Sequence, residues 1–420
     1  MSAKIKNYLQ LEQKLAKLTH LGNIFSIAHW DSATMLGKGS AASRQKEIAT
    51  FSSVIHEMST TKEMGKLINE SLAEFDYLDD WQRANLASAK KSYDSQICIT
   101  ADVQHEHSIA SSECEFIWRT ARKENDFKKL EPYLGRVFDS VRKIAGLKAE
   151  KLKKLPLDVL IDTYDPDRTS VEVKMVFDSL KSELPDLINR IMDKQKSEKV
   201  IPLSKKVGEN TQKAIGLKLM ERMGFDLDRG RLDKSAHPFC TGSNDDIRIT
   251  TRYDENYFLS SLFGVIHETG HALYQQNLPV KYRDQPVGGP KGMSFHESQS
   301  LIMENQVGTS RPFIEYLAKL LKDDFSFSGP EYSADNLYKL VTRVKPSFIR
   351  VDADEATYPL HVILRFEIEE AIISGNLRAF ELPEFWNSKM QEYLGIVPDN
   401  DANGCMQDVH WHSGWLGYFP

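Results

Sequence analysis

One stretch of the sequence has residue types and a spacing that suit chemistry at a metal ion. His267 and His271 stand four residues apart, and Glu268 directly follows the first of them, which gives the pattern His-Glu-x-x-His. Residues four apart on an α-helix lie one above the other, so both imidazoles can reach one ion with the carboxylate beside it. Composition alone would produce such a match in roughly 2 % of chains of this kind. The pattern predicts a zinc site; two surface histidines on a helix are the alternative.

A third protein ligand is expected, because a catalytic zinc ion usually takes three. Glu297 lies 26 positions after His271 (297 − 271), at the start of a second predicted helix. His296 is a competing ligand. Ser294 and Glu297 also match a capping box, Ser-x-x-Glu, in which the carboxylate would instead bind the backbone at the start of its helix.

The reaction expected of such a site is hydrolysis of a peptide bond. Zinc would lower the pKa of a bound water to about 7, and Glu268 would accept its proton during attack on the carbonyl and pass it to the leaving amine. His410 or Tyr418 could stabilise the developing oxyanion, because an imidazole N–H or a hydroxyl can donate to it. Taken alone, these two residues are more simply interpreted as a core histidine and a packed tyrosine.

This chemistry requires a helix around the motif, and the sequence favours one over residues 256–276. At about 100° per residue, Ser260 and Gly264 fall on the side of the histidines and would leave room for a cleft. Asp254 is the expected N-cap. The apolar stripe falls on the opposite side and comprises Phe258, Leu262, Val265, Ile266, Thr269 and Leu273.

The remaining elements are predicted to be mainly helical. Residues 246–252 alternate with a period of two and predict a short strand, whose free edge could pair with an extended peptide or simply cover the core. Residues 284–292 are rich in glycine and proline and predict a mobile lid. The fold class is therefore mainly α with a small β-sheet. Helical patterns cover residues 4–94, with breaks at 21–22 and 37–40, and residues 105–123, 134–155, 170–199, 310–322, 336–344 and 360–373.

Composition places these elements in an ordinary globular chain. With 41 % hydrophobic and 27 % charged residues, the 420-residue chain can bury a sizeable core. A net charge of −6 gives no basic surface for nucleic acid or an acidic membrane, so neither is expected as a partner. No apolar run is long enough for export or membrane insertion. The four cysteines lack Cys-x-x-Cys spacing, which favours free thiols in the cytoplasm.

Beyond these local patterns, nearly the whole sequence resembles the carboxypeptidase Taq family of metallocarboxypeptidases. Weaker similarity reaches Trp30-Asp31. Relatives generally continue with further helical sequence after the segment that ends this chain, so a C-terminal family segment is expected to be absent. The resemblance rests on six motifs in the family's order: His237-Pro238-Phe239, Asp246-x-Arg248-x-Thr250, His267-Glu268-x-x-His271, His296-Glu297-Ser298, Ile349-Arg350-x-x-Ala353-Asp354 and Gly404-x-x-Gln407-Asp408-x-His410-Trp411.

The resemblance implies a zincin-type helical fold akin to neurolysin and angiotensin-converting enzyme. In such a fold, a deep substrate groove runs past a small β-sheet next to the active-site helix. We expect residues 1–420 to form a single catalytic unit of two helical lobes around one groove, with the zinc-binding core at 237–305. A homodimer is also implied.

The resemblance further implies zinc-dependent removal of C-terminal residues from peptides with broad specificity; Co²⁺ or Mn²⁺ could substitute. It gives Glu268 the role of general base. It makes His267, His271 and Glu297 the metal ligands. It assigns substrate binding to His237, Arg248, Arg350 and Gln407. It gives His410 a role in binding the peptide or the transition state.

Arg350 decides between two kinds of peptidase. A carboxypeptidase needs a cation for the substrate's C-terminal carboxylate, and a planar guanidinium can bind it through two parallel hydrogen bonds. The alternative for Arg350 is an internal salt bridge to Asp352 or Asp354. An endopeptidase with an open groove and an inactive, metal-binding short form are the alternative functions.

Overall fold

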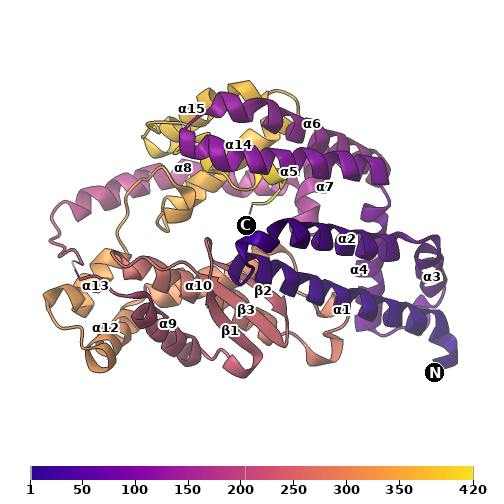
Figure 1. Cartoon of the computed structure of the whole chain (residues 1–420), viewed down its shortest axis with the longest axis horizontal. Coiled ribbons are helices and arrows are strands. Elements are labelled where there is room, and N and C mark those ends of the chain that lie inside the picture. The colour runs from indigo at the N-terminus through magenta and orange to yellow at the C-terminus, as the bar shows by residue number, and fades with distance from the viewer. Residues whose placement is uncertain (1, 204, 420) are drawn as a thin grey trace. The chain divides into compact units, whose positions relative to one another are not determined.

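The computed structural model describes residues 2–203 and 205–419 of the chain and is mainly helical with one small sheet, as predicted (Figure 1). The described chain divides into two compact units, each with its own hydrophobic core. The first unit comprises Met1–Ile97, Ile201–Lys291 and Phe295–Val341, and the second comprises Cys98–Val200, Gly292–Ser294 and Thr342–Pro420.

The first unit contains the sheet and the His-Glu-x-x-His helix. Helices α9 and α10 pack together beside the strands, and α10 also packs against β3 (Figure 1). The helices are α1 (Lys6–Thr34), α2 (Ala41–Thr60), α3 (Lys62–Leu72), α4 (Asp80–Gln96), α9 (Glu209–Met223), α10 (Phe258–Gln276), α11 (Met293–Leu301), α12 (Arg311–Phe325) and α13 (Ala334–Val341). The first turn of α11 is grouped with the second unit.

The second unit is helical throughout its described core. Helices α5 and α6 lie against each other, and α14 packs against α6, α8 and α15. Its helices are α5 (Ala101–Glu124), α6 (Phe127–Leu152), α7 (Pro156–Tyr164), α8 (Ser170–Gln195), α14 (Tyr358–Ile373) and α15 (Leu382–Leu394). Residues 404–419 form 3-10 turns and irregular backbone.

The sheet has three strands in the order β1-β3-β2. Strand β1 (Gly230–Lys234) pairs with β3 in parallel, and β2 (Phe239–Ser243) pairs with it antiparallel. Strand β3 (Asp246–Thr251) confirms the predicted strand. The prediction that this strand has a free edge is wrong, because β3 is central and both of its edges are paired; the outer edges belong to β1 and β2.

Two expected breaks in the N-terminal region differ in outcome. The break near residue 37 is confirmed, because α1 ends at Thr34 and α2 begins at Ala41. The break at residues 21–22 is wrong: α1 runs through Gly22 without interruption. One glycine costs a helix only about 1 kcal/mol, which the packing of a 29-residue helix readily offsets.

The glycine- and proline-rich loop after α10 is packed against the N-terminal helices. Gln285 is buried and accepts a hydrogen bond from Asn85 Nδ2 at 2.9 Å, while its own amide donates to the carbonyl of Glu12 at 3.0 Å. Val287 N donates to Asn85 Oδ1 at 3.1 Å. These contacts fix the middle of the predicted lid to α1 and α4.

Candidate metal centre and catalytic site

The central helix, α10, follows the prediction closely but begins two residues later. The helix spans Phe258–Gln276. Five of the six residues of the predicted stripe are at most 3 % exposed, namely Phe258, Leu262, Val265, Ile266 and Thr269, while Leu273 is half-buried. The predicted N-cap is wrong. Tyr257 occupies that position without a side-chain hydrogen bond, while Asp254 accepts from the backbone of Asn256 at 2.8 Å.

Three side chains converge as a candidate metal centre. His267 Nε2 lies 3.3 Å from Oε1 of Glu297, and His271 Nε2 lies 3.2 Å from Oε2 of the same carboxylate. The three candidate ligand atoms lie within 4.8 Å of one another. Within the described ranges, no other group of three or more histidine, cysteine, aspartate or glutamate residues brings its ligand atoms this close together. Tetrahedral ligands about 2.1 Å from a zinc ion stand about 3.4 Å apart, so the two short separations fit a shared ion.

Glu297 arrives on α11, which crosses α10 very closely. A Cβ atom added to Gly270 would lie 2.6 Å from both the carbonyl oxygen of Gln299 and the Cα of Ser300. Both atoms are backbone and cannot move aside locally. The glycine inside the motif therefore permits the approach of the helix that carries the third carboxylate.

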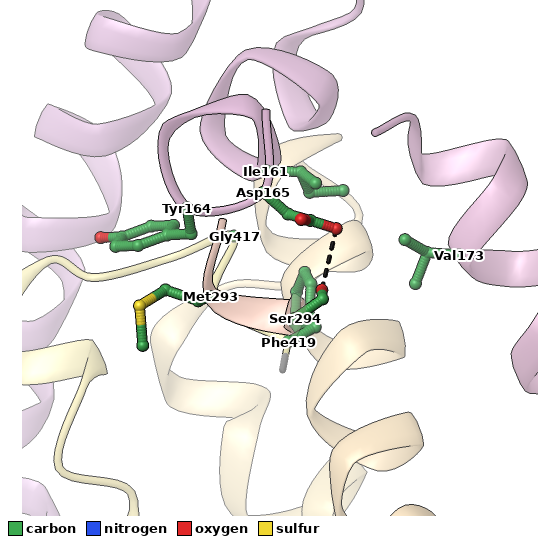
Figure 2. A pocket seen from close by; sticks show the side chains of 8 residues that line it. All are labelled: Ile161, Tyr164, Asp165, Val173, Met293, Ser294, Gly417 and Phe419. Atoms are coloured by element: carbon green, nitrogen blue, oxygen red, sulfur yellow. Dashed lines mark hydrogen bonds between the residues drawn. The ribbon is translucent and has the colours of Figure 1, made fainter. Parts of the chain in front are cut away.

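The capping box, which was the alternative interpretation of Glu297, does not form. The helix begins at Met293, and the carboxylate of Glu297 is engaged by the two histidines. Ser294 Oγ instead donates to Asp165 Oδ2 at 2.8 Å (Figure 2). The cavity at this contact holds about 20 Å³, room for one water, so it is no substrate site.

Glu304 was missed by the sequence analysis and contacts the first histidine. Its Oε2 lies 2.7 Å from Nδ1 of His267. This contact holds the imidazole ring on the side opposite Nε2, the nitrogen that faces Glu297. Glu304 belongs to a seven-residue π-helical segment, Ile302–Gly308, that continues α11. The only sequence signal was its spacing of seven residues from Glu297 (304 − 297), two helical turns.

His296 takes a different position from the one a competing ligand would need. Its carbonyl oxygen lies 3.1 Å, and its Nδ1 2.6 Å, from Nδ1 of His271. Burial lowers the pKa of His296 to about 4, so the ring is neutral near pH 7 and its Nδ1 can accept a hydrogen bond from His271 Nδ1. His296 thus contacts the side of His271 that faces away from Glu297.

Glu268 is buried beside the cluster, with 6 % of its surface exposed. Burial raises the pKa of its carboxyl to about 7, against the opposing effect of His267 and His271. A carboxyl group with this pKa can exchange a proton near neutral pH, which is what a general base requires.

Two further predicted residues lie in the first unit. His237 is exposed, and its carbonyl accepts from Thr250 Oγ1 at 3.3 Å. Arg248 pairs with Asp246 through two contacts of 3.0 and 2.8 Å. Its guanidinium lies 4.2 Å from the ring centre of Trp30, a buried side chain with 4 % of its surface exposed.

Arg350 lies in the second unit without a carboxylate partner. Its Nη1 donates to the hydroxyl of Tyr358 at 2.9 Å, and its backbone N donates to Gln407 Oε1 at 2.8 Å. Within residues 2–203 and 205–419, no ion pair joins Arg350 to Asp352, Asp354 or any other acid. Arg350 also helps to lower the pKa of the Asp408 carboxyl from a longer distance, so its guanidinium acts on one carboxylate without forming an ion pair with it.

Gln407 is buried and binds the backbone of the Arg350 loop. Its Nε2 donates to the carbonyls of Phe348 at 2.6 Å and Asn403 at 2.7 Å, while its Oε1 accepts from Arg350 N. Both amide protons are used in this way. Gln407 therefore holds the loop on which Arg350 stands.

His410 and Tyr418 lie together in the same unit. Their ring centres are 5.2 Å apart, and His410 Nδ1 is 3.5 Å from the buried carboxylate of Asp408. The structure thus groups the predicted residues in two sets. His267, Glu268, His271 and Glu297 form one in the first unit; Arg350, Gln407, His410 and Tyr418 belong to the second.

Comparison with known proteins agrees with this helical fold and its metal-binding pattern. Residues 10–420 match the family described as carboxypeptidase Taq (M32) metallopeptidase. Carboxypeptidase 1 of Bacillus subtilis (strain 168) is 35 % identical over 407 residues, which cover 97 % of this chain and 81 % of that protein. Thermostable carboxypeptidase 1 of Thermus thermophilus is also 35 % identical, over 100 % of this chain and 83 % of its own.

Solved structures show the same relationship. The metallocarboxypeptidase 1 of Trypanosoma cruzi superposes with a TM-score of 0.96 at 38 % identity, over 99 % of this chain and 84 % of that one. The M32 carboxypeptidase of Deinococcus radiodurans R1 gives a TM-score of 0.92 at 32 % identity, over 99 % and 83 %.

The fold and the match define a helical metallopeptidase, and the chain belongs to the carboxypeptidase Taq (M32) family. It is a carboxypeptidase, a hydrolase that acts on peptides, and the family's chemistry requires a divalent metal. The resemblance inferred from the six motifs is confirmed. None of the described helices is both long and apolar enough to cross a membrane.

Proposed function

We propose that the protein is a zinc-dependent metallocarboxypeptidase of broad specificity, with His267, His271 and Glu297 as metal ligands and Glu268 as general base. The observation that carries the proposal is the convergence of two imidazole nitrogens on one carboxylate at 3.2 and 3.3 Å. A histidine–histidine–carboxylate set with a further position for water is typical of catalytic zinc. When bound there, the ion would polarise the scissile carbonyl and acidify the attacking water.

The chain's own residues supply the proton transfer. Glu268 follows His267 directly and is buried, with the pKa of its carboxyl raised to about 7 by burial. In this proposal it accepts a proton from the attacking water and delivers it to the leaving amine. A nearby cation would favour the ionised form, which is the form that can act as a base.

Arg350 supplies exopeptidase specificity in this proposal. Its guanidinium donates to the hydroxyl of Tyr358 and forms no ion pair with an acid among the described residues. A substrate's terminal carboxylate would complete its charge pairing with two parallel hydrogen bonds. The absence of the salt bridge to Asp352 or Asp354 favours this role over a structural one.

His410 and Tyr418 are proposed to stabilise the oxyanion of the transition state, and His237 and Arg248 to contact the peptide. The pairing of the His410 and Tyr418 rings at 5.2 Å supports a joint role. Gln407 acts on the substrate through the loop of Arg350, whose backbone it binds. We further propose that the two units form one catalytic unit around a groove, and that the protein is a cytoplasmic homodimer.

Product analysis by mass spectrometry tests the function. One peptide should be offered with a free C-terminus, with an amidated C-terminus and with an acetylated N-terminus, each with and without a chelator. Stepwise loss of C-terminal residues from the free and acetylated peptides, abolished by the chelator, is expected. Internal cleavage of the amidated peptide would instead support an endopeptidase, and undiminished cleavage in chelator would contradict the metal mechanism.

A further inference from the structure

Helix α14 contains an ion pair that is almost completely buried. Arg365 and Glu369 stand four residues apart on the same face, and only 2 % and 0 % of their side chains is exposed. Arg365 Nη2 lies 2.7 Å from Glu369 Oε1. Burying two charges is costly even when they are paired, so their remaining contacts indicate what the pair is for.

Those remaining contacts reach the C-terminal loop. Arg365 Nε lies 2.7 Å from Oδ2 of Asp408, which is 1 % exposed, and Nη1 donates to the carbonyl of Tyr418 at 2.8 Å. Glu369 accepts from Trp411 Nε1 at 2.8 Å and from the backbone N of Gly417 at 2.6 Å. One buried pair therefore holds two separate turns of a loop that has no regular secondary structure.

Asp408 extends the network to His410. Its Oδ1 accepts from the backbone N of His410 at 2.8 Å and from that of Trp411 at 3.2 Å, so it fixes the turn on which the imidazole stands. Arg365 is the main cause that holds the pKa of Asp408 well below its usual range despite burial. The carboxylate is thus ionised when it accepts these bonds.

The second turn is confined from the other side by α7. Gly417 has φ of 95°, and a Cβ there would lie 2.6 Å from the backbone carbon of Leu160. Tyr418, which follows it, packs its ring against Tyr164 at 5.3 Å and against His410 at 5.2 Å (Tyr164 and Gly417 are seen in Figure 2). The turn is therefore confined between α7 on one side and the contacts with Glu369 and Arg365 on the other.

We propose that Arg365 and Glu369 are positioning residues of the peptidase reaction, which hold the turns of His410 and Tyr418 so that both side chains meet the oxyanion. The inference rests on the proposed roles of His410 and Tyr418. A donor on an irregular loop would otherwise sample many positions, and stabilisation of a transition state requires placement to within about 0.5 Å.

The test is Glu369→Gln in the full chain, loaded with metal. The amide keeps one oxygen for the loop but presents an NH₂ where Glu369 accepted a second bond, so we expect kcat to fall by about tenfold or more with KM changed less than about threefold. Metal content should not change. The matched control is Glu367→Gln on the same helix, which loses ion pairs to Lys181 and Lys389. It should retain kcat.

A double-mutant comparison separates positioning from plain stability. In a His410→Ala, Tyr418→Phe background, Glu369→Gln should cost less than about twofold, because the groups it positions are gone. Equal losses in both backgrounds, or equal kcat losses for Glu367→Gln, would overturn the inference. If the background variant alone keeps wild-type kcat, the oxyanion role itself fails. If it is slow while Glu369→Gln is not, only the positioning inference fails.

A second variant covers a failure to fold. Asp408→Asn keeps the oxygen that accepts from His410 and Trp411 but loses the ion pair with Arg365. It should show the same fall in kcat at nearly constant KM. Wild-type kcat in a folded Asp408→Asn protein would contradict the proposal independently of Glu369.

Discussion

Glu304 Oε2 lies 2.7 Å from Nδ1 of His267, on the side of the imidazole opposite the atom that faces Glu297. A carboxylate in this place fixes the tautomer, so that Nδ1 carries the proton and Nε2 keeps its lone pair for the metal. His271 has no such carboxylate and contacts the carbonyl and the ring of His296 instead. The two histidines are therefore supported unequally.

We predict that Glu304→Ala weakens zinc affinity by about 10- to 100-fold, the usual effect of removing such a partner. Glu304→Gln can still accept the proton of Nδ1 and should weaken it less. Competition with a chelating dye measures both. Glu315→Ala is the control, because the ion pair that Glu315 forms among the described residues is with exposed Arg311 on its own helix, α12; an equal loss of affinity in that variant would remove the special role of Glu304.

Glu297→Ala should lower the bound metal well below one equivalent. It removes the carboxylate whose two oxygens face the Nε2 atoms of His267 and His271. His296→Ala should retain the metal, since the backbone carbonyl that contacts His271 remains. Elemental analysis of dialysed protein distinguishes the two. A full equivalent of metal in Glu297→Ala, together with loss of the metal in His296→Ala, would make His296 the third ligand in place of Glu297.

Glu268→Gln should retain the metal while kcat falls by at least ~10²-fold, the usual scale for loss of a general base. The amide preserves the shape of the side chain and removes its basicity. Steady-state kinetics on protein of measured metal content give the result. A metal-loaded variant with near-normal kcat would assign the proton transfer to another group.

Arg350→Ala should lower kcat/KM for a free-acid peptide by about ten- to a hundredfold, because a hydrogen bond to a charged group contributes roughly 1.5–3 kcal/mol. Arg350→Lys should also be impaired, since lysine lacks the planar pair of donors. The amidated form of the same peptide should start as a poor substrate and lose little more. Proportional losses on both peptides, at equal metal content, would make Arg350 structural.

The stability of the protein should depend on the ionisation of Glu369. Burial raises the pKa of its carboxyl to about 7 from the usual 4.5, so the folded chain binds this proton more tightly than the unfolded chain. The resulting stabilisation is complete below pH 4.5 and is lost as the pH rises through 7. At about 1.4 kcal/mol per pKa unit, up to about 3 kcal/mol is at stake.

Glu369→Gln cannot titrate and serves as the reference. Between pH 5 and pH 8, the free energy of unfolding should fall more in wild type than in the variant, as measured by urea denaturation of both at each pH. Asp408 does not interfere, because its lowered pKa affects stability only in more acidic solution. Parallel pH profiles of the two proteins would show that Glu369 is already ionised at pH 5.

The sequence could predict what depends on local periodicity. The buried stripe of α10, and with it the alignment of His267 and His271, follows from residue spacing along one helix. Spacing also suggested Glu297. The wrong N-cap concerned a local choice: Asp254 has the side chain of a cap but accepts from the backbone of Asn256, which lies before the helix begins at Phe258.

Long-range geometry explains the rest. The central place of β3 depends on pairing with two strands, which no property of its own residues encodes. Glu304 reaches His267 from a π-helical segment, whose wider turn a regular helical pattern does not reveal. Arg365 and Glu369 resemble an exposed i, i+4 pair in sequence, and only their burial shows that they belong to the C-terminal loop.

The close approach of the Ser300 backbone to Gly270 places a size limit on one of the two variable positions of the His-Glu-x-x-His motif. The generic pattern allows any residue at positions 269 and 270, yet a Cβ atom added at Gly270 would lie 2.6 Å from the crossing backbone. A methyl group at this position would collide with the crossing helix and push the carboxylate of Glu297 away from His267 and His271. Related chains that have a glycine at this position should therefore also have a downstream glutamate ligand on a helix that crosses closely. Chains with a larger residue at this position should take their third ligand from a different part of the sequence.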